Sequence, residues 1–162
     1  HRTYISSNGE KASVSASQVK KVMPTTVQKL TGESIKVNTA QSSLVIVAEG
    51  IESALAWVAA TENQYAVYAA INCYNMGQFK WPKGTKALVI GADNDAPNPR
   101  SGLRPGLHYA TLLNQRASES GIRTKLVIPP VEGIDFDDLW NSGDCEVFSL
   151  HKTKDSLKTL AA

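Results

Sequence analysis

The chain has 162 residues, of which 42% are hydrophobic and 20% are charged, and its formal net charge is +2. This length predicts one medium-sized domain that buries a core without needing a disulfide or a structural metal. No apolar run approaches the roughly 20 residues that a membrane helix needs, and no signal-peptide pattern opens the chain. The near-neutral charge does not by itself favour strong nucleic-acid binding.

The first residue and the two cysteines indicate whether the chain is a fragment and in which redox compartment it works. The chain begins with His1 rather than methionine, so we expect it to be a fragment of a longer protein. Its two cysteines, Cys73 and Cys145, lie far apart, and neither belongs to a CxxC pair. This spacing implies neither a zinc-binding knuckle nor a disulfide framework. We therefore expect a reduced, cytoplasmic setting with no membrane partner.

Residues 1–42 predict a small β-rich lead-in packed on the main domain. Short strands are expected at residues 1–5 and 35–37, with a Ser-Ser-Asn-Gly turn at 6–9 and irregular chain at 20–24. The main domain is expected to begin at residue 43, where the sequence changes to alternating strands and helices.

Four short apolar runs predict the strands of this main domain, and two amphipathic segments predict its helices. Apolar side chains recur at helical spacing from Ile51 to Ala59. A second helix is expected from Pro105, which suits a first helical turn, to the stop at Gly121. The β-branched runs that read as buried strands are residues 44–47, 65–71, 87–90 and 125–128.

Strand–helix alternation of this kind predicts an α/β fold: a mostly parallel, Rossmann-like sheet with right-handed crossovers and helices on its faces. The segment from Asp135 has a helical composition, and Phe136, Leu139 and Trp140 can dock on the sheet. Residues 142–162 are expected to form a C-terminal helical tail, from which no function is inferred.

Carboxylates follow two of the predicted strands. Glu49 comes after the run at 44–47, and Asp93 and Asp95 come after the run at 87–90. Ligands of such sheets bind outside the carboxyl ends of the strands, so these acids are expected to form one site. Magnesium prefers carboxylate oxygens and keeps places for substrate phosphates. The pattern favours phosphoryl or nucleotidyl transfer assisted by Mg²⁺, for which Mn²⁺ can substitute.

Spacing alone leaves other interpretations open. The Glu49-Gly50 pair also suits a turn followed by a helix start. The Asp-Asn-Asp at residues 93–95 also suits turn chemistry, because these side chains bond their own backbone. A flavodoxin-like receiver domain likewise collects acidic groups at its strand ends.

Four motifs carry a resemblance to a known family. HRTYISSNGEKA, VAEGIESALA, GADNDAPNP and GIDFDDLW occur in this order. Together they resemble the Toprim region of primases and primase–helicases from phages, plasmids and integrating elements, over about residues 1–141. The resemblance implies a Toprim catalytic core at 43–141 and Mg²⁺-dependent primer synthesis. Its implied partners are a single-stranded DNA template, nucleoside triphosphates and other domains of the parent protein, including a helicase.

The same resemblance implies roles for particular residues. Glu49 matches the catalytic or metal-linked carboxylate of the first motif, and Asp93 and Asp95 match the metal-binding pair of the second. In GIDFDDLW, Asp135 is expected to contribute near the metal, and Asp138 to cap a helix. Asp137 occupies a position where the family usually has asparagine, which adds a charge.

The chain departs from the family pattern after its Asp-x-Asp motif. The family usually reaches a glycine within a few residues, whereas this chain inserts PNPRSGLRP before Gly106. We favour a tolerated surface insertion over a loop that clamps template or nucleotide. The residues expected to contact a phosphate backbone are Lys80, Lys83, Arg100 and Arg104, although a solvated surface explains such cations equally well.

Two rival functions remain open at this point. One is a Toprim metal-dependent nuclease, and the other is a non-catalytic DNA-binding module of a replication or conjugation protein. A complete primase also needs template-recognition elements, and this chain has no zinc-binding cysteines. We therefore expect little or no priming by this chain on its own.

Overall fold

The computed structural model describes residues 2–4, 6–8, 13, 20–21 and 30–150. Contacts divide the chain into two compact units, residues 1–30 and residues 31–162. The second unit holds the main sheet and is the one that positions the candidate site. Among the described residues, no helix is long and apolar enough to cross a membrane.

The first unit contains a two-stranded antiparallel ribbon. Strand β1 (Arg2–Thr3) pairs with β2 (Lys20–Lys21). The strand predicted at residues 1–5 is therefore confirmed over Arg2–Thr3. The irregular chain predicted at 20–24 is wrong at Lys20–Lys21, because pairing with a distant segment is not visible in local composition. Residues 1, 5 and 9–12 of the HRTYISSNGEKA motif lie outside the described part of the chain.

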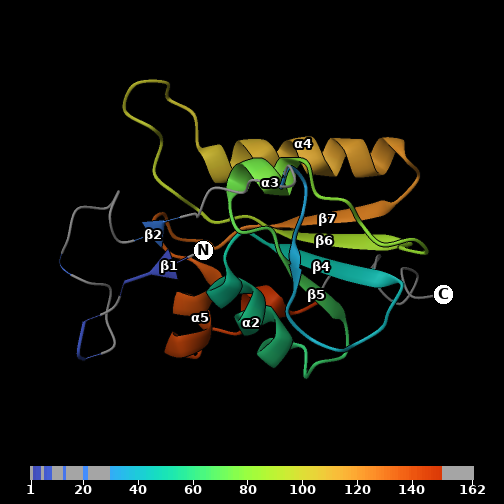
Figure 1. Ribbon diagram of the computed structural model, residues 1–162, viewed down its shortest axis with the longest axis horizontal. Helices are drawn as coiled ribbons and strands as arrows, with labels where there is room; N and C mark the ends of the chain where they lie inside the picture. The colour runs from blue at the N-terminus through green and yellow to red at the C-terminus, as the bar shows by residue number, and fades with distance from the viewer. Residues whose placement is uncertain (1, 5, 9–12, 14–19, 22–29, 151–162) are drawn as a thin grey trace. The chain divides into compact units, whose positions relative to one another are not determined.

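The second unit is a three-layered α/β structure around a five-stranded sheet (Figure 1). The strand order is β3-β5-β4-β6-β7, with β3 antiparallel at one edge and the other four strands parallel. The predicted α/β class and mostly parallel sheet are confirmed. The strands are β3 (Ile35–Lys36), β4 (Leu44–Ala48), β5 (Ala66–Ala69), β6 (Ala87–Gly91) and β7 (Arg123–Val127).

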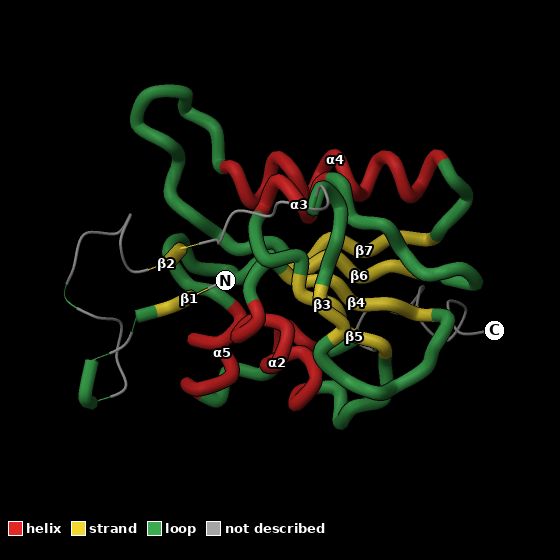
Figure 2. The backbone as a smooth tube through the Cα atoms, viewed as in Figure 1, coloured by secondary structure: helices red, strands yellow, loops and turns green. Residues whose placement is uncertain are grey.

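Helices cover both faces of the sheet (Figures 1 and 2). Helices α3 and α4 pack against each other over one face, and α2 and α5 pack together over the opposite face. The bounds of these elements are α2 (Ile51–Ala60), α3 (Cys73–Gly77), α4 (Pro105–Glu119), α5 (Phe136–Ser142) and the 3-10 helix η1 (Glu146–Phe148).

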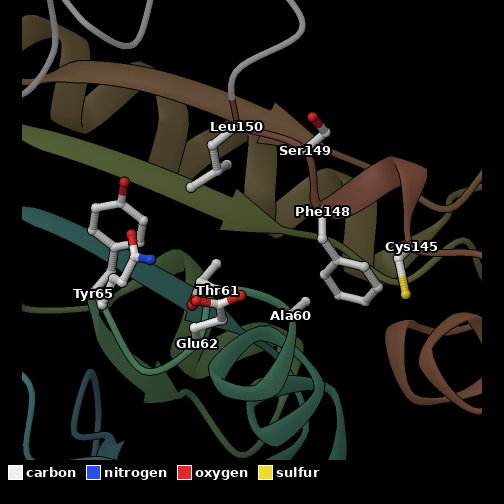
Figure 3. A pocket seen from close by; sticks show the side chains of 9 residues that line it. Ala60, Thr61, Glu62, Tyr65, Cys145, Phe148, Ser149 and Leu150 are labelled. Atoms are coloured by element: carbon white, nitrogen blue, oxygen red, sulfur yellow. The ribbon is translucent and has the colours of Figure 1, made fainter.

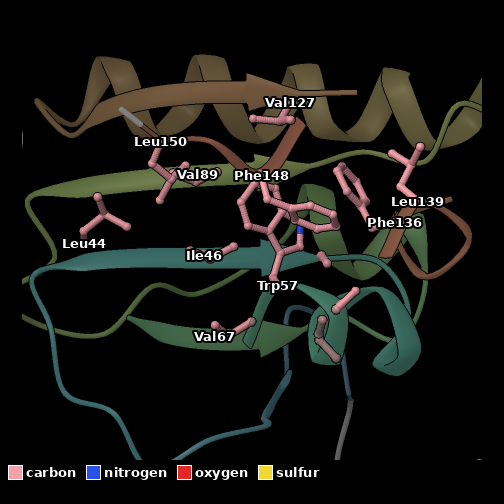
Figure 4. Close-up of a cluster of buried hydrophobic side chains, with 14 of the residues drawn as sticks. Leu44, Ile46, Trp57, Val67, Val89, Val127, Phe136, Leu139, Phe148 and Leu150 are labelled. Atoms are coloured by element: carbon pink, nitrogen blue, oxygen red, sulfur yellow. The ribbon is translucent and has the colours of Figure 1, made fainter. Parts of the chain in front are cut away.

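Alternate residues of each strand feed two separate cores, as a pleated sheet requires. In β4, Leu44 and Ile46 face α2 and α5, whereas Val45 and Val47 face α3 and α4. Figure 4 shows the first core, in which Trp57 of α2 is fully buried beside Phe136 and Phe148. Burial on both faces explains why the central strands read as continuous apolar runs.

Helix α3 was not expected from the sequence, which predicted no element between the strand at 65–71 and the strand at 87–90. The side-chain oxygen of Asn72 accepts a hydrogen bond of 2.8 Å from the backbone N–H of Asn75, and this cap starts the helix. A helix of five residues is too short to show an apolar period, so pattern reading does not find it.

The C-terminal segment was expected to be helical over residues 142–162. Helix α5 ends at Ser142, where Gly143 adopts a left-handed conformation with φ of 79°. Between residues 143 and 150, η1 is the helical element that the structure describes. Residues 151–162 lie outside the described residues, so the predicted tail helix is untested there.

Candidate metal centre

The two central strands deliver the predicted acids to one edge of the sheet. Strands β4 and β6 are parallel neighbours, paired so that Ala48 lies opposite Gly91. Glu49 follows β4 directly, and Asp93 follows β6 after Ala92. In the sheet, β5 lies on one side of β4 and β6 lies on the other. The order in which strands are added therefore reverses between β4 and β6. A switch point of this kind is where open α/β sheets bind ligands.

Gly106, the second residue of α4, marks the point on which the acids converge. A Cβ atom placed on Gly106 would lie 3.3 Å from the main-chain oxygen of Asp93, 3.4 Å from Oε2 of Glu49 and 3.7 Å from Oδ2 of Asp95. Residues after β4, after β6 and at the start of α4 therefore meet in one place. The positive end of the α4 dipole lies beside these negative charges and stabilises them.

The three acids differ in their exposure. Oε2 of Glu49 and Oδ1 of Asp93 are buried, whereas the side chain of Asp95 is exposed. A ligand would therefore reach the acids from the side of Asp95. Buried carboxylate oxygens gain from a cation, because desolvation makes their negative charge costly.

The donor set fits magnesium. Mg²⁺ is commonly held by one or two carboxylates, with water and substrate phosphates completing its octahedron. Glu49 and Asp95 each bring a carboxylate oxygen to within 3.7 Å of the same point. Within the described part of the chain, no group of three or more His, Cys, Asp or Glu side chains surrounds a single metal position. The arrangement therefore suits a cation shared with a substrate, not a closed structural site.

Cys73 also lies near these acids, and the sequence reasoning missed it. Burial raises the pKa of the Cys73 thiol, and the negative charge of Glu49 and, more weakly, that of Asp95 raise this pKa further. Cys73 is the first residue of α3, just beyond the carboxyl end of β5. The available signal was its position after a strand at the same edge of the sheet, which is also the position of Glu49.

Asp135 and Asp138 form a capping box at the start of α5. Oδ1 of Asp135 accepts a hydrogen bond of 2.9 Å from the backbone N–H of Asp138, and Oδ2 of Asp138 accepts one of 3.2 Å from that of Asp135. Asp135 is therefore the N-cap, and Asp138 is its reciprocal partner. The expected contribution of Asp135 to metal binding stays a prediction.

The four cations expected to bind nucleic acid are in different places. Lys80 is exposed and pairs with Glu33 at 2.6 Å, and Lys83 is exposed on the connection that leads into the amino end of β6. Arg100 is exposed on the loop before α4. Arg104 pairs with Glu132 and donates a hydrogen bond of 2.7 Å to Oδ1 of Asn94. The structure does not gather these four residues around the carboxylates, and their role in nucleic-acid binding stays a prediction.

The structure also contains a pocket of about 290 Å³, shown in Figure 3. Thr61 and Glu62 after α2, Tyr65 before β5, and Phe148 and Leu150 line it. These residues border the amino end of β5, whereas the acids follow the carboxyl ends of β4 and β6. The pocket is therefore separate from the carboxylate site.

Comparison with known proteins identifies the family of the chain. A family model of the Toprim domain matches residues 44–144, a segment that contains all three converging acids. No curated protein and no solved structure matches the chain. Toprim domains are generally metal-dependent phosphotransfer modules, and they generally bind Mg²⁺. The matched segment covers more than half of the chain, and the chain therefore belongs to the Toprim family.

Proposed function

We propose that this chain is the Toprim domain of a DNA primase from a plasmid, phage or integrating element. It would carry out Mg²⁺-dependent nucleotidyl transfer that makes primers on single-stranded DNA. The observation that carries the catalytic part is that carboxylate oxygens of Glu49 and Asp95 meet the main-chain oxygen of Asp93 beside Gly106, at the switch point of the sheet. Oxygen ligands at a substrate-accessible edge suit metal-assisted transfer of a phosphoryl group.

Each acid has a distinct task in this proposal. Asp93 and Asp95 would hold the cation, with the exposed Asp95 nearest to incoming substrate. Glu49, which is half-buried, would complete the shell or accept the proton of the attacking 3′-hydroxyl. The bound Mg²⁺ supplies charge neutralisation and orientation for the reacting oxygens. The first turn of α4 would add backbone N–H groups, which favour a phosphate at a helix N-terminus.

The choice of primase over other Toprim reactions is supported by the motif order. HRTYISSNGEKA and GIDFDDLW flank the acidic motifs and resemble primases and primase–helicases more than Toprim nucleases. GIDFDDLW forms the capping box and the start of α5. Helix α5 packs on α2, which begins two residues after Glu49. A single-stranded template, nucleoside triphosphates and further domains such as a helicase are the partners that this proposal requires.

Calorimetric titration of Mg²⁺ and Mn²⁺ tests the catalytic part. Wild type should bind the metal, and Asp93→Ala/Asp95→Ala should not. Asp144→Ala is the matched control, because Asp144 is an exposed acid after α5. Absence of binding to wild type, even with DNA and nucleotide present, would sink the catalytic proposal and leave a DNA-binding module.

A second assay separates joining from cutting. The chain, alone and joined to its parent protein, is incubated with single-stranded DNA, nucleoside triphosphates and Mn²⁺, and separately with supercoiled plasmid. Primer products that depend on Asp93 and Asp95 would support the primase. Strand scission without primers would instead assign the site to a nuclease.

A further inference from the structure

The carboxylate site depends on a connection that has no regular structure. The segment 96–104 separates Asp95 from the start of α4. Nevertheless Gly106 lies against Glu49 and Asp95, with its Cβ position 3.4 Å and 3.7 Å from their oxygens. Packing of α4 on the sheet places the far end of this loop. The finer position of Gly106 against the acids also depends on contacts at the base of the loop.

Arg104 and Asn94 bridge the ends of that loop. Asn94 stands between the two aspartates of the second motif, and Arg104 is the residue before α4. Nη1 of Arg104 donates a hydrogen bond of 2.7 Å to Oδ1 of Asn94, and Nη2 pairs with Glu132. We call this arrangement the Asn94–Arg104 clasp. It closes the loop at its base.

Asn94 is also tied to the segment that follows β7. Its Nδ2 donates a hydrogen bond of 2.9 Å to the main-chain oxygen of Pro129. Its own main-chain oxygen accepts one of 2.7 Å from the N–H of Gly133. Both the side chain and the backbone of Asn94 are thus held, which also restrains the main chain of the aspartates on either side of it.

The outer part of the loop is closed by its own bonds. The backbone N–H of Asn98 donates to the oxygen of Leu103 at 2.7 Å, and that of Gly102 donates to the oxygen of Asn98 at 2.8 Å. Oδ1 of Asn98 accepts from the N–H of Arg100 at 2.9 Å. The tip therefore folds on itself, and the clasp ties the base of the loop to the site.

We propose that Arg104 and Asn94 are positioning residues that assemble the metal centre, and that Arg104 serves this purpose instead of binding a nucleic-acid phosphate. The proposal rests on the metal-binding function proposed above. A planar guanidinium offers two donors in a fixed fork, so one arginine can bridge Asn94 and Glu132 at once. Lysine carries the same charge but lacks this fork.

Electrostatics and positioning predict opposite results for Arg104→Ala. Removing the positive charge of Arg104, two residues before Gly106, should strengthen cation binding if charge alone matters. Loss of the clasp should weaken it, because substitutions of residues that orient metal ligands lower metal affinity by about tenfold or more. The sign of the change in Mn²⁺ affinity therefore decides between them.

The experiment measures Mn²⁺ dissociation constants by calorimetry for wild type, Arg104→Ala, Arg104→Lys, Asn94→Ala and the Asn94→Ala/Arg104→Ala double variant. Each single alanine variant should weaken binding about tenfold, and Arg104→Lys should not restore it. The double variant should weaken binding by less than the product of the two single effects, because both changes remove the same Asn94–Arg104 hydrogen bond. Arg100→Ala is the matched control for charge on this loop, and its Mn²⁺ affinity should equal that of wild type.

Other results overturn the inference without touching the proposed function. Wild-type affinity, or stronger binding, in Arg104→Ala would show that the clasp does not position the acids. Weaker binding of single-stranded DNA with unchanged Mn²⁺ affinity would assign Arg104 to the nucleic acid.

If Arg104→Ala does not fold, Glu132→Ala removes one arm of the clasp at an exposed position and should still weaken Mn²⁺ binding. Failure of wild type to bind Mn²⁺ would refute the proposed function itself.

Discussion

Gly106 stands where a larger side chain would enter the space between the acids. Alanine favours a helix over glycine by up to about 1 kcal/mol, which would stabilise α4. Its Cβ would nevertheless lie 3.3 Å from the main-chain oxygen of Asp93 and 3.4 Å from Oε2 of Glu49, and these close contacts oppose that gain. We expect weaker Mn²⁺ binding with a melting temperature that changes little. Calorimetry and thermal unfolding check the two parts, and unchanged Mn²⁺ affinity would contradict this placement of the metal.

Cys73 offers a chemical probe of the same site. Alkylation requires the thiolate, so the raised pKa of Cys73 slows its reaction near neutral pH. Glu49→Gln removes one cause of the raised pKa, and the pH profile of alkylation should then shift to lower pH. Iodoacetamide rates measured in a Cys145→Ser background isolate Cys73. The control is Glu52→Gln, because Glu52 is an exposed acid in the first turn of α2. This substitution should leave the pH profile of alkylation unchanged.

At the scale of elements, α5 depends on its N-terminal capping box. Asp135→Ala should cost about 1 kcal/mol of unfolding free energy, whereas Asp135→Asn should cost little, because asparagine is an equally good N-cap. The pair also separates capping from metal binding. If Asp135 contributes to the metal, Asp135→Asn should weaken Mn²⁺ binding while stability is kept. Urea unfolding and calorimetry on both variants give the answer.

The acids at the start of α5 also make its stability depend on pH. Burial raises the pKa of Asp137 above 3.8, and the charges of Asp135, Asp138 and Glu52 raise it further, although a hydrogen bond with Asn141 opposes them. The folded state therefore binds more protons than the unfolded state, and stability falls as pH rises from 3.8 through the folded pKa.

Substitution of Asp137 tests this pH dependence. Asp137→Asn removes the charge and should raise the unfolding free energy at pH 7 by at most about 0.5 kcal/mol, since the site is near the surface. The gain should vanish below pH 3.8, where the wild-type carboxyl is also neutral. Melting temperatures across this range measure the effect. A gain that persists at low pH would point to a cause other than charge.

At the scale of the whole molecule, Trp57 joins three elements into one core. It belongs to α2 and packs on Phe136 of α5 and Phe148 of η1, with ring centroids 5.4 Å and 4.9 Å away. Trp57→Ala should cost about 3–5 kcal/mol of unfolding free energy. Leu55→Ala, at a position 49% exposed on the same helix, should cost no more than about 0.5 kcal/mol. Comparable losses in urea unfolding would mean that this core does not hold the helices on the sheet.

The fold could be read largely from the sequence because its signals are local. The runs at 44–47 and 87–90 are apolar and β-branched, and β4 and β6 form there as central strands. Pro105 and Gly121 bracket α4, which runs from Pro105 to Glu119. The paired strand at Lys20–Lys21 and the short helix α3 were missed. The first depends on a distant partner, and the second is too short to show a period.

The class of the fold, the acidic residues at the strand ends and the resemblance to Toprim domains could all be read from the amino-acid sequence. The meeting of Glu49, Asp93 and Asp95 beside Gly106, the nearness of Cys73, and the contacts of Arg104 with Asn94 and Glu132 became visible only in the folded chain. The difference lies in how far apart in the sequence the interacting residues are. Apolar periods and strand ends are set by neighbours along the chain, whereas these contacts exist because strand order brings distant loops to one edge.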